Sequence, residues 1–212
     1  MAANAPMTIV VKGDPTNGGK LGDCPFCHRA LLTLSTKGLK FDIEYVDFAA
    51  KPDWVVALGG KVPILKVLSE DIIMPDSDKI VVYLEDKYPS PSMKSEGGIP
   101  EWMGKIFPAF RAFVNGPTDA TFDAMIDTLK ASEEALAKVK GPLFGGTALN
   151  EIDAAFAPRL YHIMVMSFNK GFGFPPDLGF LWRYMGYIQT LDAWQQVDYG
   201  TKKIVEGWSK PH

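Results

Sequence analysis

The sequence is poor in cysteine: its 212 residues contain only two, Cys24 and Cys27. Secreted domains that depend on disulfides need more cysteines at wider spacing, so we expect a reducing compartment. The first residues, 1–6, lack a charged segment followed by an apolar run, and they contain no arginine. We therefore expect neither a secretory signal nor a transit peptide there, and a cytoplasmic location.

Long apolar runs and basic clusters are also missing. No stretch approaches the roughly 20 apolar residues that a membrane-spanning helix requires, so no stable membrane association is expected. The chain has 22 basic and 25 acidic side chains, a net charge of -3, and no lysine-rich stripe. This balance argues against nucleic acid as a partner. The length and the 47% hydrophobic content suffice for a buried core in one or two domains.

The N-terminal part alternates between strand and helix patterns. Glycine and proline mark a loop at 14–22, Pro25 suits the first position of a helix, and Gly38 suits its end. Strands are predicted at 7–12, 41–45, 62–68 and 72–73, and further helices at 51–58 and from Asp76-Ser77 to about Pro89. The order β-α-β-α-β-β-α predicts two parallel pieces followed by a hairpin in a small α/β domain.

Residues 90–100 form the candidate linker, with two prolines, three serines and two glycines. Beyond it only helical periodicity remains, at 102–115, 118–140, 151–168, 178–195 and 201–208. Asn150 and Asp153 have the spacing of a capping box at a helix start. The expected architecture is an α/β domain over residues 1–92 and an all-α domain over residues 93–212.

The motif Asp23-Cys24-Pro25-Phe26-Cys27 lies between the first predicted strand and the first predicted helix. A sulfur at a helix N-terminus faces unpaired N–H groups and the positive end of the helix dipole, which stabilise a thiolate. We therefore predict Cys24 as a nucleophile rather than an inert buried cysteine. Cys27 has either an accessory or structural role or that of a resolving thiol. No metal is expected, because there is no second cysteine pair and the histidines are scattered.

Three polar residues near this motif have both a functional and a structural interpretation. Asp23 either contacts a substrate hydroxyl or relays a proton, or it caps the helix. Lys12 either supplies positive charge to the thiolate or to an oxygen-rich substrate, or it is a solvated lysine at a strand end. Lys51 either pairs with a ligand carboxylate or lies on the surface. Sequence spacing alone does not decide among these.

Two predicted turns offer backbone groups to a ligand. A cis bond between Val62 and Pro63 would expose the N–H and C=O of Val62 for pairing with an extended peptide. Asp76-Ser77 caps a helix, and the free N–H groups of that helix start could also hold a ligand carboxylate. In the C-terminal part, His162 is expected as a core histidine and Trp208 as the anchor of the tail, unless they border a site.

Six segments together resemble the glutathione transferase superfamily. They are Gly22-Asp23-Cys24-Pro25-Phe26-Cys27, Lys51-Pro52-Asp53-Trp54, Gly60-Lys61-Val62-Pro63, Asp76-Ser77-Asp78, Ala157-Pro158-Arg159-Leu160-Tyr161-His162 and Gly207-Trp208. Within the superfamily the pattern is most similar to the glutathione-dependent dehydroascorbate reductases of plants and green algae. The resemblance covers nearly the whole chain and implies a thioredoxin-like α/β domain followed by an all-α domain, which is the glutathione transferase fold.

The resemblance also implies residue roles, with glutathione as co-substrate and Cys24 as the catalytic nucleophile. The residues implied for ascorbate or dehydroascorbate are Lys12, Asp23, His162 and Trp208. The residues implied for glutathione are Lys12, Asp23, Phe26, Lys51, Val62, Asp76, Ser77 and His162. Only these small molecules are expected as partners, with the chain acting as a monomer.

The implied activity is reduction of dehydroascorbate to ascorbate by glutathione. It would pass through a thiolate, a sulfenic acid and a glutathione mixed disulfide in a ping-pong sequence, and would serve ascorbate recycling and redox homeostasis. Two alternatives stay open. One is an omega-class or glutaredoxin-like thiol transferase that acts on mixed disulfides. The other is a non-catalytic, membrane-inserting module similar to the chloride-channel-like relatives.

Overall fold

The structure is a computed structural model that describes residues 7–14 and 20–209. Its contacts divide the chain into two compact units: unit 1 is Met1–Ser92 with Gln196–Tyr199, and unit 2 is Met93–Gln195 with Gly200–His212. The N-terminal segment 1–6 and loop residues 15–19, for which the sequence gave expectations, lie outside the described residues. The short return of 196–199 to unit 1 has no local sequence signal.

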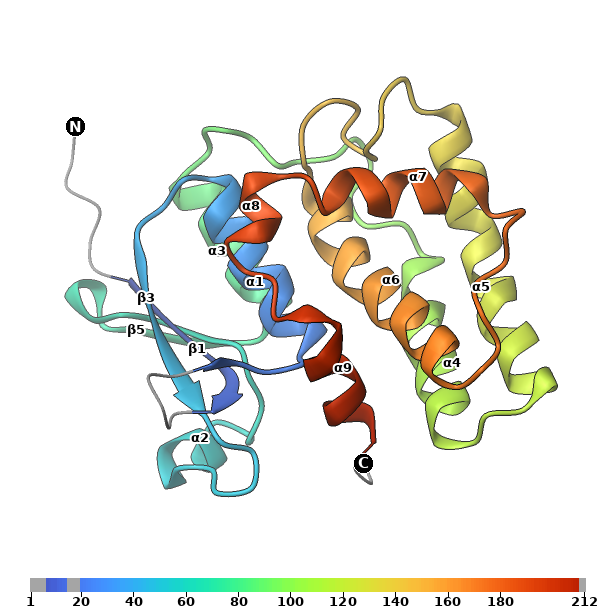
Figure 1. The fold of residues 1–212 in the computed structure, drawn as a ribbon. Helices are drawn as coiled ribbons and strands as arrows, with labels where there is room; N and C mark the ends of the chain where they lie inside the picture. The colour runs from blue at the N-terminus through green and yellow to red at the C-terminus, as the bar shows by residue number, and fades with distance from the viewer. Residues whose placement is uncertain (1–6, 15–19, 210–212) are drawn as a thin grey trace. The chain divides into compact units, whose positions relative to one another are not determined.

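Unit 1 is built on a mixed sheet around β1 (Met7–Asp14) (Figure 1). β1 pairs in parallel with β3 (Phe41–Val46) and antiparallel with β4 (Ile64–Val67), and β4 pairs antiparallel with β5 (Ile72–Pro75). This confirms the prediction of two parallel pieces followed by a hairpin. The turn between β4 and β5 contains a short 3-10 helix, η1 (Leu68–Glu70). A two-residue strand that the sequence did not reveal, β2 (Lys20–Leu21), pairs antiparallel with the end of β1.

Helices α1 (Pro25–Thr36) and α3 (Ser77–Lys87) lie side by side against this sheet (Figure 1). The first helix begins at Pro25 as predicted, because a proline at this position sacrifices no hydrogen bond. The start of α3 is also as predicted: the Asp76 carboxylate accepts a hydrogen bond of 2.8 Å from the N–H of Asp78. The predicted short helix near Trp54 is α2 (Asp53–Ala57).

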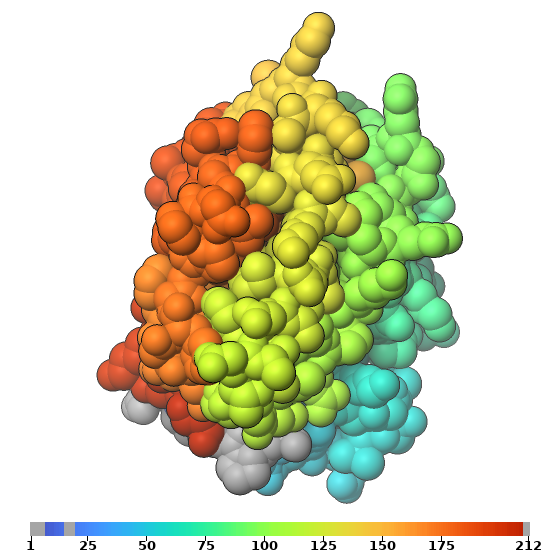
Figure 2. All heavy atoms as spheres, turned by 90° about the vertical axis from the view of Figure 1, so that its right-hand side faces the viewer, coloured from blue at the N-terminus to red at the C-terminus, as the bar shows by residue number. Residues whose placement is uncertain are grey.

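Unit 2 is entirely helical among the residues described, apart from one isolated β-bridge between Leu143 and Gly146. Its helices are α4 (Met103–Asn115), α5 (Asp119–Lys138), α6 (Glu151–Asn169), α7 (Gly179–Ile188), α8 (Asp192–Gln195) and α9 (Gly200–Trp208). α6 packs against α4, α7 and α9 and is buried on most of its sides, as its mostly apolar sequence requires. Figure 2 shows the surface of α5, in yellow-green to yellow, beside the orange surface of α7, which it contacts.

The cap of α6 confirms the predicted capping box. The Asn150 side chain accepts hydrogen bonds from the N–H groups of Ile152 and Asp153, and the Asp153 carboxylate accepts one of 3.0 Å from the Asn150 N–H. Asp153 also accepts from the N–H groups of Phe144 and Gly145, so it fixes the loop before the helix. Local sequence is sufficient here because the bonding partners lie within ten positions of one another.

The predicted single helix at 178–195 was wrong, since the structure divides it into α7 and α8. The break follows Ile188, where the Thr190 hydroxyl donates to the Tyr187 carbonyl at 2.7 Å and the Thr190 N–H bonds the same carbonyl. A threonine hydroxyl that bonds a carbonyl of the last helical turn competes with the backbone hydrogen bonds of the helix and favours the end of the helix. The start of α7 is capped from another helix, because the Glu133 carboxylate accepts from the N–H groups of Phe180 and Leu181, each at 2.8 Å.

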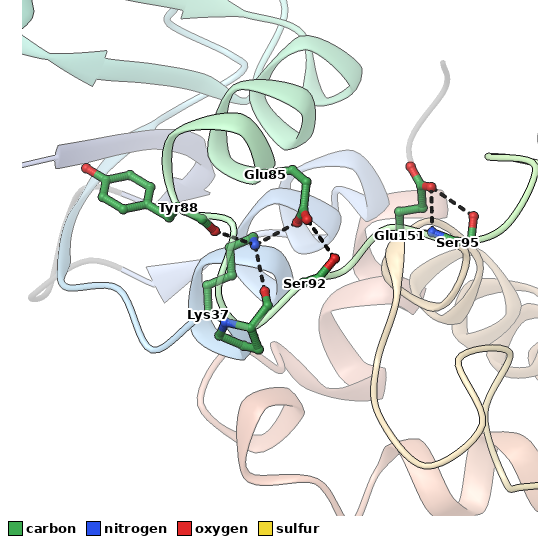
Figure 3. A network of polar contacts seen from close by, with 7 residues as sticks. Lys37, Glu85, Tyr88, Ser92, Ser95 and Glu151 are labelled. Carbon is green, nitrogen blue, oxygen red and sulfur yellow. Dashed lines mark hydrogen bonds and ion pairs between the residues drawn. The ribbon is translucent and has the colours of Figure 1, made fainter.

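A buried polar network ties α1 to α3 within unit 1 (Figure 3). The Lys37 side chain is fully buried, and its ammonium group lies 2.7 Å from a carboxylate oxygen of Glu85. It also donates to the backbone carbonyls of Tyr88 and Pro91, and Glu85 accepts from the Ser92 hydroxyl. The network therefore fixes the segment that follows α3. Figure 3 also shows a contact within unit 2: the Glu151 carboxylate accepts hydrogen bonds from the backbone N–H and from the hydroxyl of Ser95.

None of the helices in the described ranges is long and apolar enough to span a bilayer.

Candidate active site

Most of the residues that the sequence suggested for a site lie at one edge of the unit 1 sheet. β1 and β3 run in parallel with Lys12 opposite Val46, so the ends of both strands meet there. β4 runs the other way, and its first residue, Ile64, lies opposite Pro75 at the end of β5. The ends of β1, β3 and β5 and the start of β4 therefore lie together, and so do the segments that follow β3 and β5 and the segment that precedes β4.

The chain that leads into α1 passes close to the end of β1. The Gly22 N–H donates to the Lys12 carbonyl at 2.8 Å, and a Cβ atom at Gly22 would lie only 2.9 Å from that carbonyl oxygen. A glycine is required for this approach. Beside it, the Lys12 ammonium group lies 2.6 Å from a carboxylate oxygen of the mostly buried Asp23. The sequence had offered a helix cap as one interpretation of Asp23, but its carboxylate forms this ion pair.

Cys24 is the half-buried N-cap residue of α1. The pKa of its thiol is lowered from its ordinary value of 9.0, first by a hydrogen bond from the Cys27 thiol. The backbone N–H groups of Cys27 and Phe26 and the positive charge of Lys12 lower this pKa further and outweigh the effect of burial. The N-terminus of a helix, a neighbouring thiol and a cation together stabilise the thiolate.

Cys27 has the opposite character. Its side chain is buried, and burial raises the pKa of its thiol well above the ordinary value, with a further increase from the hydrogen bond to Cys24. Cys27 therefore keeps its proton at neutral pH and donates it in a hydrogen bond to the sulfur of Cys24. This gives Cys27 the accessory role that the sequence left open beside a resolving role.

Lys51 lies at the same edge, in the segment after β3. Its ammonium group donates to the carbonyl of Gly60 at 2.9 Å and lies 4.2 Å from the ring centroid of Phe48. The ammonium group of Lys12 lies 5.6 Å from the same centroid. One aromatic ring thus links the lysine next to Cys24 with the lysine that the sequence suggested as a carboxylate ligand.

The remaining glutathione candidates of unit 1 also converge. The Val62-Pro63 peptide bond is cis, and the Pro63 carbonyl accepts a hydrogen bond of 3.2 Å from the Asp76 N–H. Ser77 is the buried first residue of α3, and Asp78 beside it pairs with Arg29 of α1. These contacts place the valine backbone, the N-terminus of α3 and the helix of Cys24 in one region. Phe26 lies half-buried in the first turn of α1.

His162 and Trp208 form a pair inside unit 2. The Trp208 indole N–H donates to Nδ1 of His162 at 2.9 Å, joining α9 to α6. His162 is fully buried, as expected for a core histidine, and the Trp208 ring packs edge-on against Phe110 with centroids 4.9 Å apart. Trp208 thus anchors the tail, and it is the half-buried member of the pair that keeps exposed surface.

Two residues near Cys24 were missed by sequence analysis. Phe48 is an exposed aromatic residue two positions after the end of β3, which is a weak signal. Tyr199 belongs to the short segment that returns to unit 1, and its ring packs edge-on against His28 of α1 with centroids 4.9 Å apart. Burial and then the negative charges of Cys24 and Asp23 raise its pKa well above the ordinary value. No local sequence pattern predicts that Tyr199 lies near Cys24.

The chemistry available is that of a thiolate next to cationic and N–H groups. No group of three metal-ligating side chains occurs within 7–14 and 20–209. The half-buried sulfur has the lowered pKa that suits a nucleophile, and the ion pair of Lys12 and Asp23 offers both donors and acceptors. Lys51 and the α3 N-terminus suit carboxylates. The arrangement supports covalent thiol chemistry on an oxygen-rich substrate with an anionic co-substrate.

Comparison with known proteins agrees with this chemistry. The family described as glutathione S-transferase, N-terminal domain, matches residues 23–87. The chloroplastic glutathione S-transferase DHAR3 of Arabidopsis thaliana is 32% identical over 211 residues, which cover 97% of this chain and 81% of the relative. The probable cytosolic glutathione S-transferase DHAR1 of Oryza sativa is 32% identical over 206 residues, covering 95% of this chain and 96% of the relative.

A solved structure is similar over the whole length. The crystal structure of Chlamydomonas reinhardtii dehydroascorbate reductase matches with a TM-score of 0.89 and 43% sequence identity, covering 98% of this chain and 99% of that protein. The fold predicted from the sequence, a thioredoxin-like domain followed by a helical domain, is thereby confirmed.

Proposed function

The chain belongs to the glutathione S-transferase family, and we propose that it acts there as a glutathione-dependent dehydroascorbate reductase. The observation that carries this proposal is the lowered pKa of the Cys24 thiol beside the Lys12–Asp23 pair. The names of the DHAR relatives and of the algal reductase agree with it over nearly the full chain.

The reaction starts with the Cys24 thiolate, which attacks dehydroascorbate. With one water, the sulfur becomes a sulfenic acid and ascorbate leaves, so the sulfur is oxidised by two electrons and the substrate is reduced by two. The thiol of one glutathione condenses with the sulfenic acid to a mixed disulfide and releases water. A second glutathione attacks the glutathione sulfur of this disulfide, which restores the Cys24 thiolate and releases glutathione disulfide and a proton.

Glutathione carries two carboxylates at the ends of an extended peptide. Lys51 offers a cation for one of them, and the N-terminus of α3 offers the positive end of its dipole and the Ser77 hydroxyl for the other. The backbone of Val62, before the cis bond, offers a partner for the peptide between these ends. Phe26 supplies an apolar surface next to the sulfur.

Dehydroascorbate carries carbonyl and hydroxyl groups and no carboxylate. Lys12 donates to such oxygens, and Asp23 accepts from hydroxyls, so this ion pair suits both the oxidised and the reduced substrate. His162 is buried and acts through Trp208, whose indole N–H it fixes. We assign Trp208 as the substrate-bordering member of the pair and His162 as its positioning residue.

The test is ascorbate formation from dehydroascorbate and glutathione, followed by absorbance, with the wild type and Cys24→Ser. We expect turnover in the wild type and its loss in a folded Cys24→Ser protein. Near-normal rates in that variant would refute the assignment. Turnover of a model mixed disulfide is measured on the same preparation: a far faster reaction there would favour a thiol transferase. A conductance assay with liposomes tests the non-catalytic alternative.

The compartment and the oligomeric state are further proposals. The relatives include a chloroplastic and a cytosolic protein, and we propose for this chain the cytoplasm, the compartment in the name of the Oryza sativa relative that it covers to 96%. Microscopy of a fluorescent fusion to the C-terminus tests this. We also propose a monomer, which light scattering after size-exclusion chromatography tests.

A further inference from the structure

Phe48 is held in a fixed turn although its side chain is exposed. The Asp47 carboxylate accepts a hydrogen bond of 2.8 Å from the N–H of Ala49, and the Asp47 carbonyl accepts one of 3.2 Å from the N–H of Ala50. Both bonds span Phe48, which therefore has little backbone freedom. Its side chain remains 38% exposed, so the fixed ring is accessible to solvent.

The ring of Phe48 lies within cation–π distance of two lysines. The ammonium group of Lys51 is 4.2 Å from its centroid and that of Lys12 is 5.6 Å away, both inside the limit of about 6 Å for such contacts. The two lysines come from different segments, after β3 and at the end of β1. Phe48 is the side chain that contacts both.

The two lysines on the ring differ in their partners. Lys12 is paired with Asp23, but Lys51 has only the Gly60 carbonyl and the Phe48 ring as partners among the described residues. Lys51 thus keeps its positive charge on the ring that also contacts Lys12, the lysine whose charge lowers the pKa of Cys24. A cation held on an aromatic face keeps its charge and loses side-chain freedom, so an anion that binds it meets a preorganised partner.

We propose that Phe48 positions Lys12 and Lys51 as one anion-binding platform beside Cys24, and that this platform selects thiols with a carboxylate over neutral thiols. Phe48 is then a specificity-determining residue for the co-substrate, a consequence that rests on the proposed function. Without the aromatic ring, Lys51 retains only its hydrogen bond to the Gly60 carbonyl, and Lys12 retains only its pairing with Asp23.

The direct test compares two alkylating reagents at Cys24, iodoacetate and iodoacetamide. Both react with the thiolate in the same way and differ in charge, so the ratio of their rates reports local positive potential and cancels changes in the thiolate fraction. Modification of Cys24 is quantified by peptide mass spectrometry. We expect the iodoacetate to iodoacetamide ratio to fall about three- to ten-fold in Phe48→Leu, because two cation–π contacts are lost. Phe48→Tyr keeps the ring and should retain the ratio.

Phe180→Leu is the matched control. Phe180 is 39% exposed and has the guanidinium of Arg183 at 4.4 Å from its centroid, and neither residue is among those assigned to the site. Its substitution should leave the ratio unchanged. An unchanged ratio in Phe48→Leu, or an equal fall in Phe48→Leu and Phe180→Leu, would overturn the proposal. This readout needs no dehydroascorbate, so it is independent of whether the proposed activity is correct.

Kinetics of the full reaction give a second readout. In Phe48→Leu we expect kcat/KM for glutathione to fall about three- to ten-fold through a raised KM, while kcat/KM for 2-mercaptoethanol stays the same. Equal losses for both thiols would contradict a selective platform and indicate general damage to the site. A Lys51→Met substitution should lower kcat/KM for glutathione less in the Phe48→Leu background than in the wild type, since the lysine is already displaced.

Discussion

Cys24 and Cys27 lie one helical turn apart and differ in every property that matters for reactivity. Cys24 is half-buried at the helix N-terminus and has a lowered pKa, whereas Cys27 is buried and has a raised pKa. Burial is the first cause of the raised pKa of Cys27, and the hydrogen bond from Cys27 to Cys24 is the first cause of the lowered pKa of Cys24. In this account Cys27 lowers the pKa of the Cys24 thiol while it keeps its own proton.

This predicts a specific result for substitution of Cys27. Cys27→Ala removes the main contribution that lowers the pKa of Cys24, so that pKa should rise toward 9.0. Alkylation of Cys24 by iodoacetamide at neutral pH should slow about three- to ten-fold, and the rates of the two proteins should converge at high pH. Cys27→Ser keeps a donor and should lie between them. Equal pH profiles for wild type and Cys27→Ala would contradict the role of Cys27.

The site residues were predictable from sequence to different degrees. Cys24 followed from helix-start chemistry, and so did the cap at Asp76. Lys12, Lys51, His162 and Trp208 were undecided until the family resemblance was considered, because their partners lie far away in sequence. Phe48 and Tyr199 were missed, since a ring that contacts two distant lysines or a distant helix leaves no local pattern.

α1 carries a second buried titratable group, His28. Its side chain is fully buried, and burial lowers its pKa from 6.5 to about 3. The folded protein therefore keeps His28 neutral over a range in which the unfolded chain takes up a proton. The stability due to neutral His28 is complete above pH 6.5 and is lost as the pH falls from 6.5 toward about 3.

The corresponding measurement is the free energy of unfolding of wild type and His28→Leu across this range. Within it, the wild type should lose about 1 kcal/mol more stability per pH unit than the variant, because only the wild type binds this proton on unfolding. Leucine fills much of the same volume, so the difference in slope is the informative quantity. Parallel curves would show that His28 does not titrate on unfolding.

Helices and strands were predictable where their ends have local causes. Pro25 at the start of α1 and Asn150 before α6 act through neighbours in the chain, and both predictions are confirmed. The break between α7 and α8 and the strand β2 were not predicted. The strand β2 consists of two residues that pair with the end of β1. The start of α7 is capped by Glu133 of another helix, so this contact leaves no local pattern.

Unit 1 as a whole depends on the Lys37 network, which joins α1, α3 and the segment after α3. Lys37→Met should reduce the free energy of unfolding by about 3–5 kcal/mol, because Glu85 is left as a buried charge without its partner. Denaturant unfolding measures this effect. Lys40→Met is the control, since Lys40 is exposed and should tolerate the change. Similar stabilities for the two variants would refute the importance of the network.

The proposed site residues come from both units. Unit 1 contains the thiolate, the two lysines and the N-terminus of α3, and unit 2 contains the Trp208–His162 pair. The domain boundary at 92/93 and the residue roles remain predictions of this account. All of them depend on Cys24 being the atom that takes the oxidising equivalents from dehydroascorbate.

A single turnover without glutathione tests that dependence most directly. The protein is mixed with dehydroascorbate and dimedone, which traps sulfenic acids, and both released ascorbate and the labelled peptide are quantified. The account predicts a rapid release of ascorbate in an amount equal to the chains present, with the label on Cys24 and neither signal in Cys24→Ser. Absence of ascorbate release, or a label found on Cys27 alone, would contradict it.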